Sequence, residues 1–224
     1  MREIVLDTET TGFDPQQGHR VVEIGCIELF NHVPTGKTFH KYCNPERDMP
    51  AEAFAVHGLG EDFLRGQPLF ADIVEGLVEF LGDEAPIIAH NAEFDMRFVN
   101  FELGKCGLAK LPMTRAIDTV MMARTKFPGA PASLDALCKR FNIDNGSRTL
   151  HGALLDAQLL AEVYLELIGG RQAGLMLGEN AAEEAALAAI EIVHRVARAH
   201  AASEAELAAH AEFLKKVSNP IWLR

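Results

Sequence analysis

The chain has 224 residues, of which 48% are hydrophobic and 24% are charged, so it is long enough to bury a full hydrophobic core. Its net charge of −11 excludes a protein that grips nucleic acid over a broad basic face, and its four scattered cysteines exclude a small disulfide framework. No apolar run reaches the ~18 residues of a membrane span and no signal peptide is apparent. We therefore expect a cytoplasmic protein with no membrane partner.

Hydrophobic periodicity predicts an α/β fold. Three strands come first, over residues 2–7, Val21–Phe30 and Lys37–Cys43, and their short connections are typical of an antiparallel meander. Helices and short strands then alternate, and they are expected at Leu69–Leu81 (helix), Ile87–Ala89 (strand), 93–105 (helix), Ile117 (strand), 119–126 (helix), Leu134–Phe141 (helix) and Ala153–Ile168 (helix). This order predicts one mixed five-stranded sheet with helices on both faces.

The first strand ends in the acidic stretch Asp7-Thr8-Glu9-Thr10-Thr11-Gly12. Successive side chains of a strand point to opposite faces, so Asp7 and Glu9 place two carboxylates side by side on one face. At an effective dielectric constant of about 20 and a separation of roughly 5 Å, these charges repel by about 3 kcal/mol. A divalent cation such as Mg²⁺ or Mn²⁺ would offset that repulsion, and a solvated strand end is the alternative.

Two later segments add acidic residues to this pattern. Asn91 is a typical N-cap residue, so Asp95 is expected in the first turn of a helix that follows a central strand, where α/β sheets bind ligands. An acid favoured only by the helix dipole is the alternative. Asp156 lies on the apolar stripe of the last long helix, and a carboxylate turned toward a core needs a partner or a metal ion. His151 is expected in the loop before that helix, above the same site.

Taken together, these motifs resemble those of the DEDD exonucleases of the His-containing type, which have the ribonuclease H-like fold. The resemblance covers residues 1 to about 170 without a missing motif. It implies phosphodiester hydrolysis with two divalent cations, Mg²⁺ or Mn²⁺, held by four carboxylates, and with a histidine as the general base. The matching positions are Asp7, Glu9, Asp95 and Asp156 for the acids and His151 for the base.

Within this superfamily, the motifs and the stretch Phe54–Leu59 look most like the proofreading exonucleases of bacterial replicative DNA polymerases. The resemblance implies removal of mispaired nucleotides, as 5′-monophosphates, from a single-stranded or frayed 3′ end of DNA. It also implies that Thr10, His57 and Phe94 hold the terminal nucleotide. The alternatives are a turn position for His57 and a core position for Phe94. The competing functions are a stand-alone RNA-processing exonuclease and a non-catalytic nucleotide-binding scaffold.

The sequence predicts an exonuclease domain over residues 1–170 and a linker with an α-helical tail over 171–224. Gly169-Gly170 separates the two, and the tail is rich in alanine. Apolar residues recur at helical spacing over 187–197, and Ser203–Glu206 has the pattern of a capping box. Helices folded back onto the core and a disordered tail are the alternatives to a partner-binding role.

Two partner-binding segments are expected in this tail. Gln172, Leu175 and Leu177 have the spacing of the short linear motif by which bacterial polymerase subunits dock on the sliding clamp, although an ordinary apolar linker is the alternative. By the same family resemblance, residues 181–224 would hold the polymerase catalytic (alpha) subunit. Trp222 is a candidate anchor there, because buried tryptophans often dominate interface energetics.

Overall fold

The computed structural model describes residues 1–146, 150–170 and 201–217. The chain divides into two units, Met1–Leu175 and Met176–Arg224. The domain boundary expected after residue 170 stays a prediction. None of the helices in the described ranges is long and apolar enough to cross a membrane.

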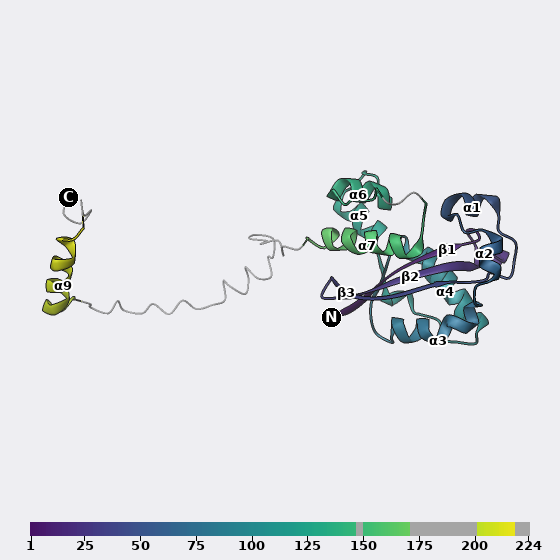
Figure 1. The fold of residues 1–224 in the computed structure, drawn as a ribbon, viewed down its shortest axis with the longest axis horizontal. Coiled ribbons are helices and arrows are strands. Elements are labelled where there is room, and N and C mark those ends of the chain that lie inside the picture. Colours follow the sequence, from purple (N-terminus) through teal and green to yellow (C-terminus); the bar gives the residue numbers. More distant parts are fainter. Residues whose placement is uncertain (147–149, 171–200, 218–224) are drawn as a thin grey trace. The chain divides into compact units, whose positions relative to one another are not determined.

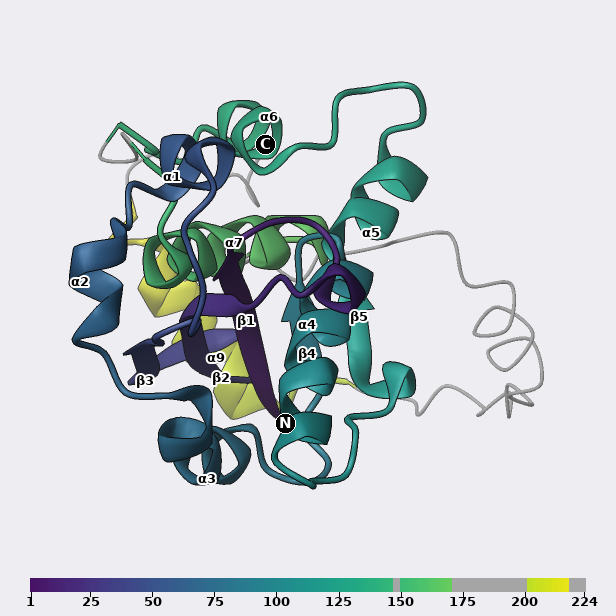
Figure 2. The same ribbon diagram turned by 90° about the vertical axis from the view of Figure 1, so that its right-hand side faces the viewer.

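One mixed sheet forms the centre of the first unit, in the strand order β3-β2-β1-β4-β5 (Figures 1 and 2). Neighbours β1, β2 and β3 are antiparallel, whereas β4 lies parallel to both β1 and β5. The strands are β1 (Arg2–Thr10), β2 (Val21–Phe30), β3 (Val33–Tyr42), β4 (Ile87–Ala89) and β5 (Ala116–Asp118). The predicted α/β class and mixed five-stranded sheet are therefore confirmed.

The side chains of β1 alternate between two hydrophobic cores. Ile4 and Leu6 pack in the core beneath α3 (Phe70–Leu81) and α4 (Ala92–Lys105). Val5 faces the opposite core, which is covered by α5 (Thr119–Lys126), α6 (Leu134–Phe141) and α7 (Ala153–Leu167). Figure 1 shows these two helical layers on either side of the sheet. The layers position the site, because its residues come from β1 and from the first turns of α4 and α7.

The β2–β3 connection is shorter than the sequence predicted. Only Asn31 and His32 separate the strands, and their positive φ angles of 49° and 67° are those of a tight hairpin turn. The strand expected over Lys37–Cys43 therefore begins earlier, at Val33, and its predicted start was wrong. Pro34 pairs with Leu29 on β3, which is an edge strand and so tolerates a missing N–H.

Two short α-helices in the first unit were not predicted, nor were the single 3₁₀ turns Pro15–Gln17 and Met113–Arg115. The α-helices are α1 (Ala51–His57) and α2 (Glu61–Arg65), and the chain turns between them at Gly58 with φ 70°. With seven and five residues they are too short to give a clear helical period, and their stability depends on tertiary packing. The buried side chains of these helices are His57 and Leu64.

The second unit contains one described helix, α9 (Glu204–Leu214). Its predicted capping box is confirmed: Ser203 Oγ accepts from the Glu206 N–H and Glu206 accepts from the Ser203 N–H. Leu207 and Phe213 are each more than half exposed on this helix. The expected helical stretch 187–197 lies outside the described residues, as do Gln172, Leu175, Leu177 and Trp222.

Candidate active site

The carboxyl half of β1 supplies the first two acidic residues. Asp7 and Glu9 share the face of the sheet that α7 covers, since they continue the series of Val5. Glu9 is 8% exposed and Asp7 is half-buried. The direct cross-strand partner of Asp7 on β2 is Gly25. The predicted side-by-side placement of the two carboxylates therefore follows from regular strand pairing of β1 through Glu9.

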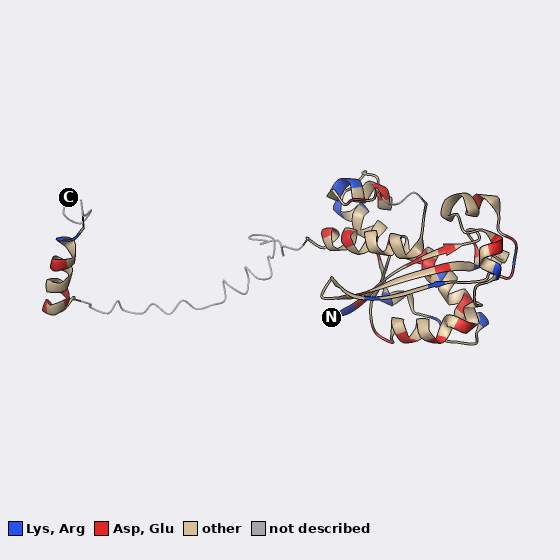
Figure 3. Cartoon of the chain, in the orientation of Figure 1, with Lys and Arg blue, Asp and Glu red and all other residues tan. Residues whose placement is uncertain are grey.

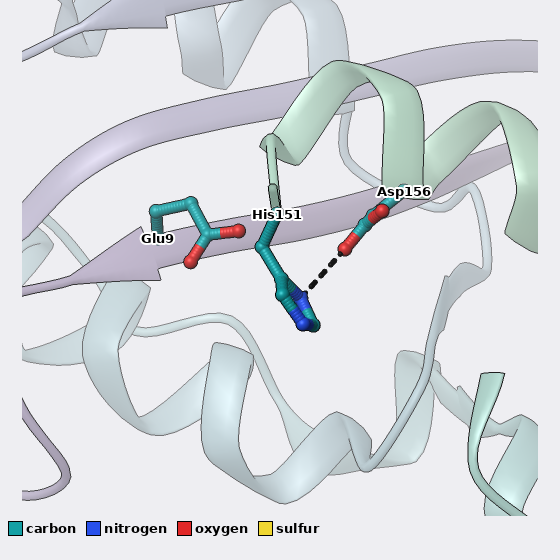
Figure 4. A group of neighbouring side chains, drawn as sticks. All are labelled: Glu9, His151 and Asp156. Carbon is teal, nitrogen blue, oxygen red and sulfur yellow. Dashed lines mark hydrogen bonds and ion pairs between the residues drawn. The ribbon is translucent and has the colours of Figure 1, made fainter. Parts of the chain in front are cut away.

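Helix α7 and the loop before it bring two more residues to this face. Asp156 lies in the first turn of α7 and is 3% exposed, so the predicted inward orientation is confirmed. His151 lies in the loop just before the N-cap Gly152, as expected, and its Nδ1 is 3.1 Å from Asp156 Oδ2. Figure 4 shows Glu9 facing this pair. One potential ligand atom from each of the three side chains lies within 4.8 Å of the others.

Gly25 allows α7 to approach the sheet closely enough for this arrangement. A Cβ at Gly25 would lie 2.4 Å from the carbonyl carbon and oxygen of Ala153 and from the backbone nitrogen of Leu154. The first turn of α7 therefore rests directly on the β2 backbone beside Asp7. Any larger residue would separate the helix that carries Asp156 from the strand that carries the other two acids.

Asp95 reaches the site from the opposite helical layer. It lies in the first turn of α4, is 3% exposed, and its Oδ1 accepts a 2.7 Å hydrogen bond from Thr8 Oγ1. Burial raises the pKa of the Asp95 carboxyl to about 7. The predicted N-cap position of Asn91 is confirmed, but its side chain makes no capping hydrogen bond. Asn91 adopts a left-handed conformation with φ 70°, which turns the chain sharply from β4 into α4.

One cavity of about 280 Å³ collects the five residues assigned to catalysis from sequence. Its lining is Asp7, Thr8, Glu9, His90, Phe94, Asp95, Ser133, Leu134, Asp135, His151 and Asp156. Thr8 and His90 were not predicted as site residues. Thr8 could have been found from strand alternation, because it must face α4 when its two neighbours face α7. His90 binds the Thr119 hydroxyl through Nδ1 at 2.9 Å, a contact with no local sequence signal.

An adjoining cavity of about 440 Å³ is lined by the three residues expected to hold a nucleotide, and we call it the nucleotide cavity. Thr10, His57 and Phe94 all line it, and Phe94 also lines the carboxylate cavity. His57 is 5% exposed at the end of α1, and burial lowers its pKa. Its Nδ1 accepts from the Leu59 N–H at 3.0 Å, and Nε2 makes no hydrogen bond to the described residues. Phe94 also packs on Phe98, so it serves the core and the cavity together.

The loop after β1 adds a residue that sequence reasoning missed. His19 lines the same cavity of about 440 Å³, with its ring where a side chain at Gly12 would otherwise be: a Cβ there would lie 2.3 Å from His19 Cε1. Thr11 Oγ1 accepts from the Arg20 N–H at 3.0 Å and lies 3.2 Å from His19 Nδ1.

The charge of the carboxylate cavity fits divalent cations. Asp7, Glu9, Asp95 and Asp156 supply oxygen donors, which hard ions prefer, and no Lys or Arg of the described residues lines this cavity to offset them. Over the first unit, Lys and Arg are scattered among more numerous Asp and Glu (Figure 3). The negative potential of the site therefore calls for bound cations, and the exonuclease superfamily depends on divalent metal ions.

Comparison with solved structures agrees with this architecture. The chain is similar to exonuclease X in complex with 5′ overhanging duplex DNA, at 25% identity and a TM-score of 0.58 over 74% of this chain and 90% of that one. It has the fold of the nuclease domain of 3′hExo, a DEDDh family member bound to rAMP, at 18% identity and a TM-score of 0.63 over 75% and 91% of the two chains.

Comparison of sequences identifies the family. The exonuclease family model RNase_T matches residues 4–164. The DNA polymerase III subunit epsilon of Rickettsia felis is 49% identical over 223 residues, which are 97% of each chain. The subunit of the same name from Escherichia coli K12 is 41% identical over 239 aligned positions, 99% of this chain and 97% of the relative. The chain therefore belongs to the exonuclease family, among the DNA polymerase III epsilon subunits, and is a 3′→5′ exonuclease of the proofreading type.

Proposed function

We propose that Asp7, Glu9, Asp95 and Asp156 hold two divalent cations, Mg²⁺ or Mn²⁺, and that His151 is the general base of the reaction. The observation that carries this proposal is the convergence of all five residues on one cavity, with ligand atoms of Glu9, His151 and Asp156 within 4.8 Å of one another. Four carboxylates in one small cavity are stable only with compensating positive charge.

The side chains divide the chemistry between them. When bound, the cations would supply Lewis-acid activation of the attacking water and neutralise charge on the departing 3′ oxygen. Asp156 accepts from His151 Nδ1–H, because an ionised carboxylate oxygen can only accept, and this hydrogen bond leaves the lone pair of the neutral ring on Nε2. Nε2 can then take the proton of the attacking water. Thr8 fixes the orientation of Asp95 through its 2.7 Å hydrogen bond.

The adjoining cavity holds the terminal nucleotide in this proposal. Phe94 lies between the two cavities and offers an aromatic face to the base or sugar. His57, at the end of α1, and Thr10, at the end of β1, complete the lining that contacts this nucleotide. The scissile phosphodiester then lies over the carboxylates while the nucleotide to be removed occupies the larger, mostly apolar cavity.

The substrate that fits best is a single-stranded or frayed 3′ end of DNA. The chain has a net charge of −11 and cannot hold a long duplex by charge, so it should engage the few nucleotides that separate from the template. A mispaired terminus frays at lower free-energy cost than a paired one. Primers with a 3′ mismatch should therefore be degraded several times faster than matched primers, as measured by release of 5′-mononucleotide in Mg²⁺.

The Asp156→Ala variant is the control for this comparison. It should fold but release no nucleotide from either primer, since it removes a buried acid of the site. Equal rates on matched and mismatched primers would contradict proofreading selectivity, and near-normal turnover by Asp156→Ala would contradict the site assignment. An RNA-processing enzyme would instead degrade an RNA primer faster than the DNA primer of the same sequence. The names of the relatives favour DNA replication over that alternative and over a non-catalytic scaffold.

The partners in this proposal are the polymerase catalytic (alpha) subunit and the sliding clamp. The relatives are named as subunits of DNA polymerase III, which supports assembly into a polymerase complex. The clamp contact rests on the spacing of Gln172, Leu175 and Leu177, and the alpha contact on residues 181–224 with Trp222. Helix α9 supports a docking role, since Leu207 and Phe213 are exposed on it and would gain from burial against another protein.

A further inference from the structure

A third cavity, of about 440 Å³, lies along the exposed stripe of α4 and has a different chemistry from the two cavities of the site. Its cationic members are Arg97 and Lys110, and its neutral polar members include Gln16 and Asn100. The Asn100 side chain makes two hydrogen bonds with the Leu111 backbone. Its Nδ2 donates to the carbonyl oxygen at 3.0 Å, and its Oδ1 accepts from the N–H at 2.7 Å. These bonds fix the segment that carries Lys110 against α4.

This Arg97–Lys110 cavity adjoins the nucleotide cavity across the loop after β1. Phe13 lines the nucleotide cavity, whereas Pro15 and Gln16, two and three residues later, line the Arg97–Lys110 cavity. Arg97 Nη2 donates a 2.7 Å hydrogen bond to the Phe13 carbonyl oxygen, which links α4 to the loop after β1. On α4, Phe94 and Arg97 lie three residues apart, so the same helix contributes to both cavities.

The charges of the cavities differ in a way that matters for a polyanion. Among the residues that the structure describes, no Lys or Arg lines either cavity of the site. The Arg97–Lys110 cavity has two cations and one acid, Glu93, in its lining. In a chain of net charge −11, such a pair beside the site offers phosphate groups a local attraction.

We propose that the Arg97–Lys110 cavity binds backbone phosphates of DNA next to the terminal nucleotide. The inference rests on the proposed function, because it takes the strand end to lie in the two cavities of the site. The same phosphodiester groups can come from two DNA strands. One is the strand being degraded, upstream of its 3′ end, and the other is the complementary strand of a primer–template duplex. Lys110 provides a point charge, and Arg97 provides further N–H donors beside the one that Phe13 engages.

Charge reversal at Lys110 tests the proposal in the full-length protein. Lys110→Glu is compared with Lys105→Glu, also an exposed lysine, which ends α4 and lies outside this cavity. For each protein, kcat/KM is measured on a single-stranded oligonucleotide, on a primer–template duplex and on the p-nitrophenyl ester of thymidine 5′-monophosphate. The small ester has no upstream phosphates, so the ratio of DNA to ester activity isolates contacts outside the site.

In Lys110→Glu, the ratio of kcat/KM on DNA to kcat/KM on the ester should fall about threefold to tenfold at low salt. The fall should come from a higher KM for DNA. The salt dependence should also become shallower, by roughly 0.7 in log–log slope per lost phosphate contact on the single strand and roughly 0.9 on the duplex. If the ratio falls on both DNA substrates, the bound phosphates belong to the degraded strand. If it falls on the duplex alone, they belong to the complementary strand. An unchanged ratio and slope, or an equal effect in Lys105→Glu, would overturn the inference. If the wild type failed to hydrolyse the ester and both DNAs, the proposed function itself would fail.

Discussion

At the scale of single residues, His151 has the position of a base but the exposure of a loop residue. It approaches a buried carboxylate through Nδ1, yet nearly half of its side chain is exposed. His151→Ala should therefore leave the fold intact and lower the single-turnover cleavage rate by roughly 10²–10⁴-fold, the usual contribution of a general base. The rate is measured by rapid quench on a short DNA oligonucleotide in saturating Mg²⁺.

A ligand role for His151 would give a different signature. The cluster with Glu9 and Asp156 is close enough for all three to bind an ion. If His151 acts only as the base, His151→Ala should retain the Mn²⁺-induced rise in melting temperature of the wild type. Loss of that rise would make His151 a metal ligand, and unchanged turnover would remove it from the mechanism.

Asp95 should make the stability of the metal-free protein fall as pH rises. Burial raises its pKa from an ordinary 3.8 to about 7, so between about pH 4 and pH 7 the unfolded chain releases a proton that the folded chain retains. The native state binds more protons in this window, and the free energy of unfolding therefore decreases with increasing pH and levels off above pH 7. Chemical denaturation in EDTA at several pH values measures this slope.

Asp95→Asn should remove that pH dependence. The amide cannot ionise, and its oxygen can still accept from Thr8, so the metal-free variant should match the wild type near pH 4 and exceed it at pH 8. It should be inactive at both values because a carboxylate of the site is lost. The same change at the exposed Asp62 is the matched control. Equal pH slopes for wild type and Asp95→Asn would contradict the raised pKa.

At the scale of elements, the contact of α7 with β2 decides whether the site forms. A Cβ at Gly25 would overlap the Ala153 backbone at 2.4 Å, so Gly25→Ala must move the helix outward. We expect a loss of about 1–3 kcal/mol in stability, typical of overpacking, and a much larger proportional loss of cleavage as Asp156 and His151 withdraw from β1. Denaturant unfolding and the cleavage rate are measured on the same preparation.

Gly104→Ala is the matched control for this substitution. Gly104 lies in α4, and a Cβ there would meet nothing within 4 Å, so the change should preserve activity and slightly favour the helix. Gly25→Ala with wild-type kcat and Mn²⁺ affinity would show that the α7–β2 contact does not position the site.

At the scale of the whole molecule, the two expected partner contacts should separate by mutation. Replacing Gln172 and Leu175 with Ala should weaken binding to the sliding clamp and spare the alpha subunit, because short linear motifs bind through a few anchors. Deleting residues 203–224 should weaken binding to alpha and spare the clamp. Surface plasmon resonance with each immobilised partner measures both contacts.

Neither change should alter cleavage of a free oligonucleotide, which serves as the control for both. Inactivation or unfolding of the first unit by the deletion would instead make the tail part of the catalytic fold. The tail would then not be a tether, and the boundary expected after residue 170 would be wrong.

The sequence by itself determined the fold class, and it predicted which acidic residues would meet in one cavity. Strand alternation placed Asp7 and Glu9 on one face, and the helical period turned Asp156 inward, because these patterns follow from backbone geometry over a few residues. Longer elements such as α3 and α7 were predicted nearly to their ends for the same reason. Their apolar stripes extend over several turns, so one residue that departs from the pattern does not hide the helical period.

Only the tertiary structure decided how the two helical layers meet at the end of β1. The bond from Thr8 to Asp95 spans 87 positions, and the approach of Ala153 to Gly25 joins segments more than a hundred residues apart. No local pattern encodes such contacts, and the short helix α1, which carries His57 to the nucleotide cavity, likewise depends on tertiary packing. Propensity acts between neighbours in the chain, whereas a site is assembled from residues that packing brings together.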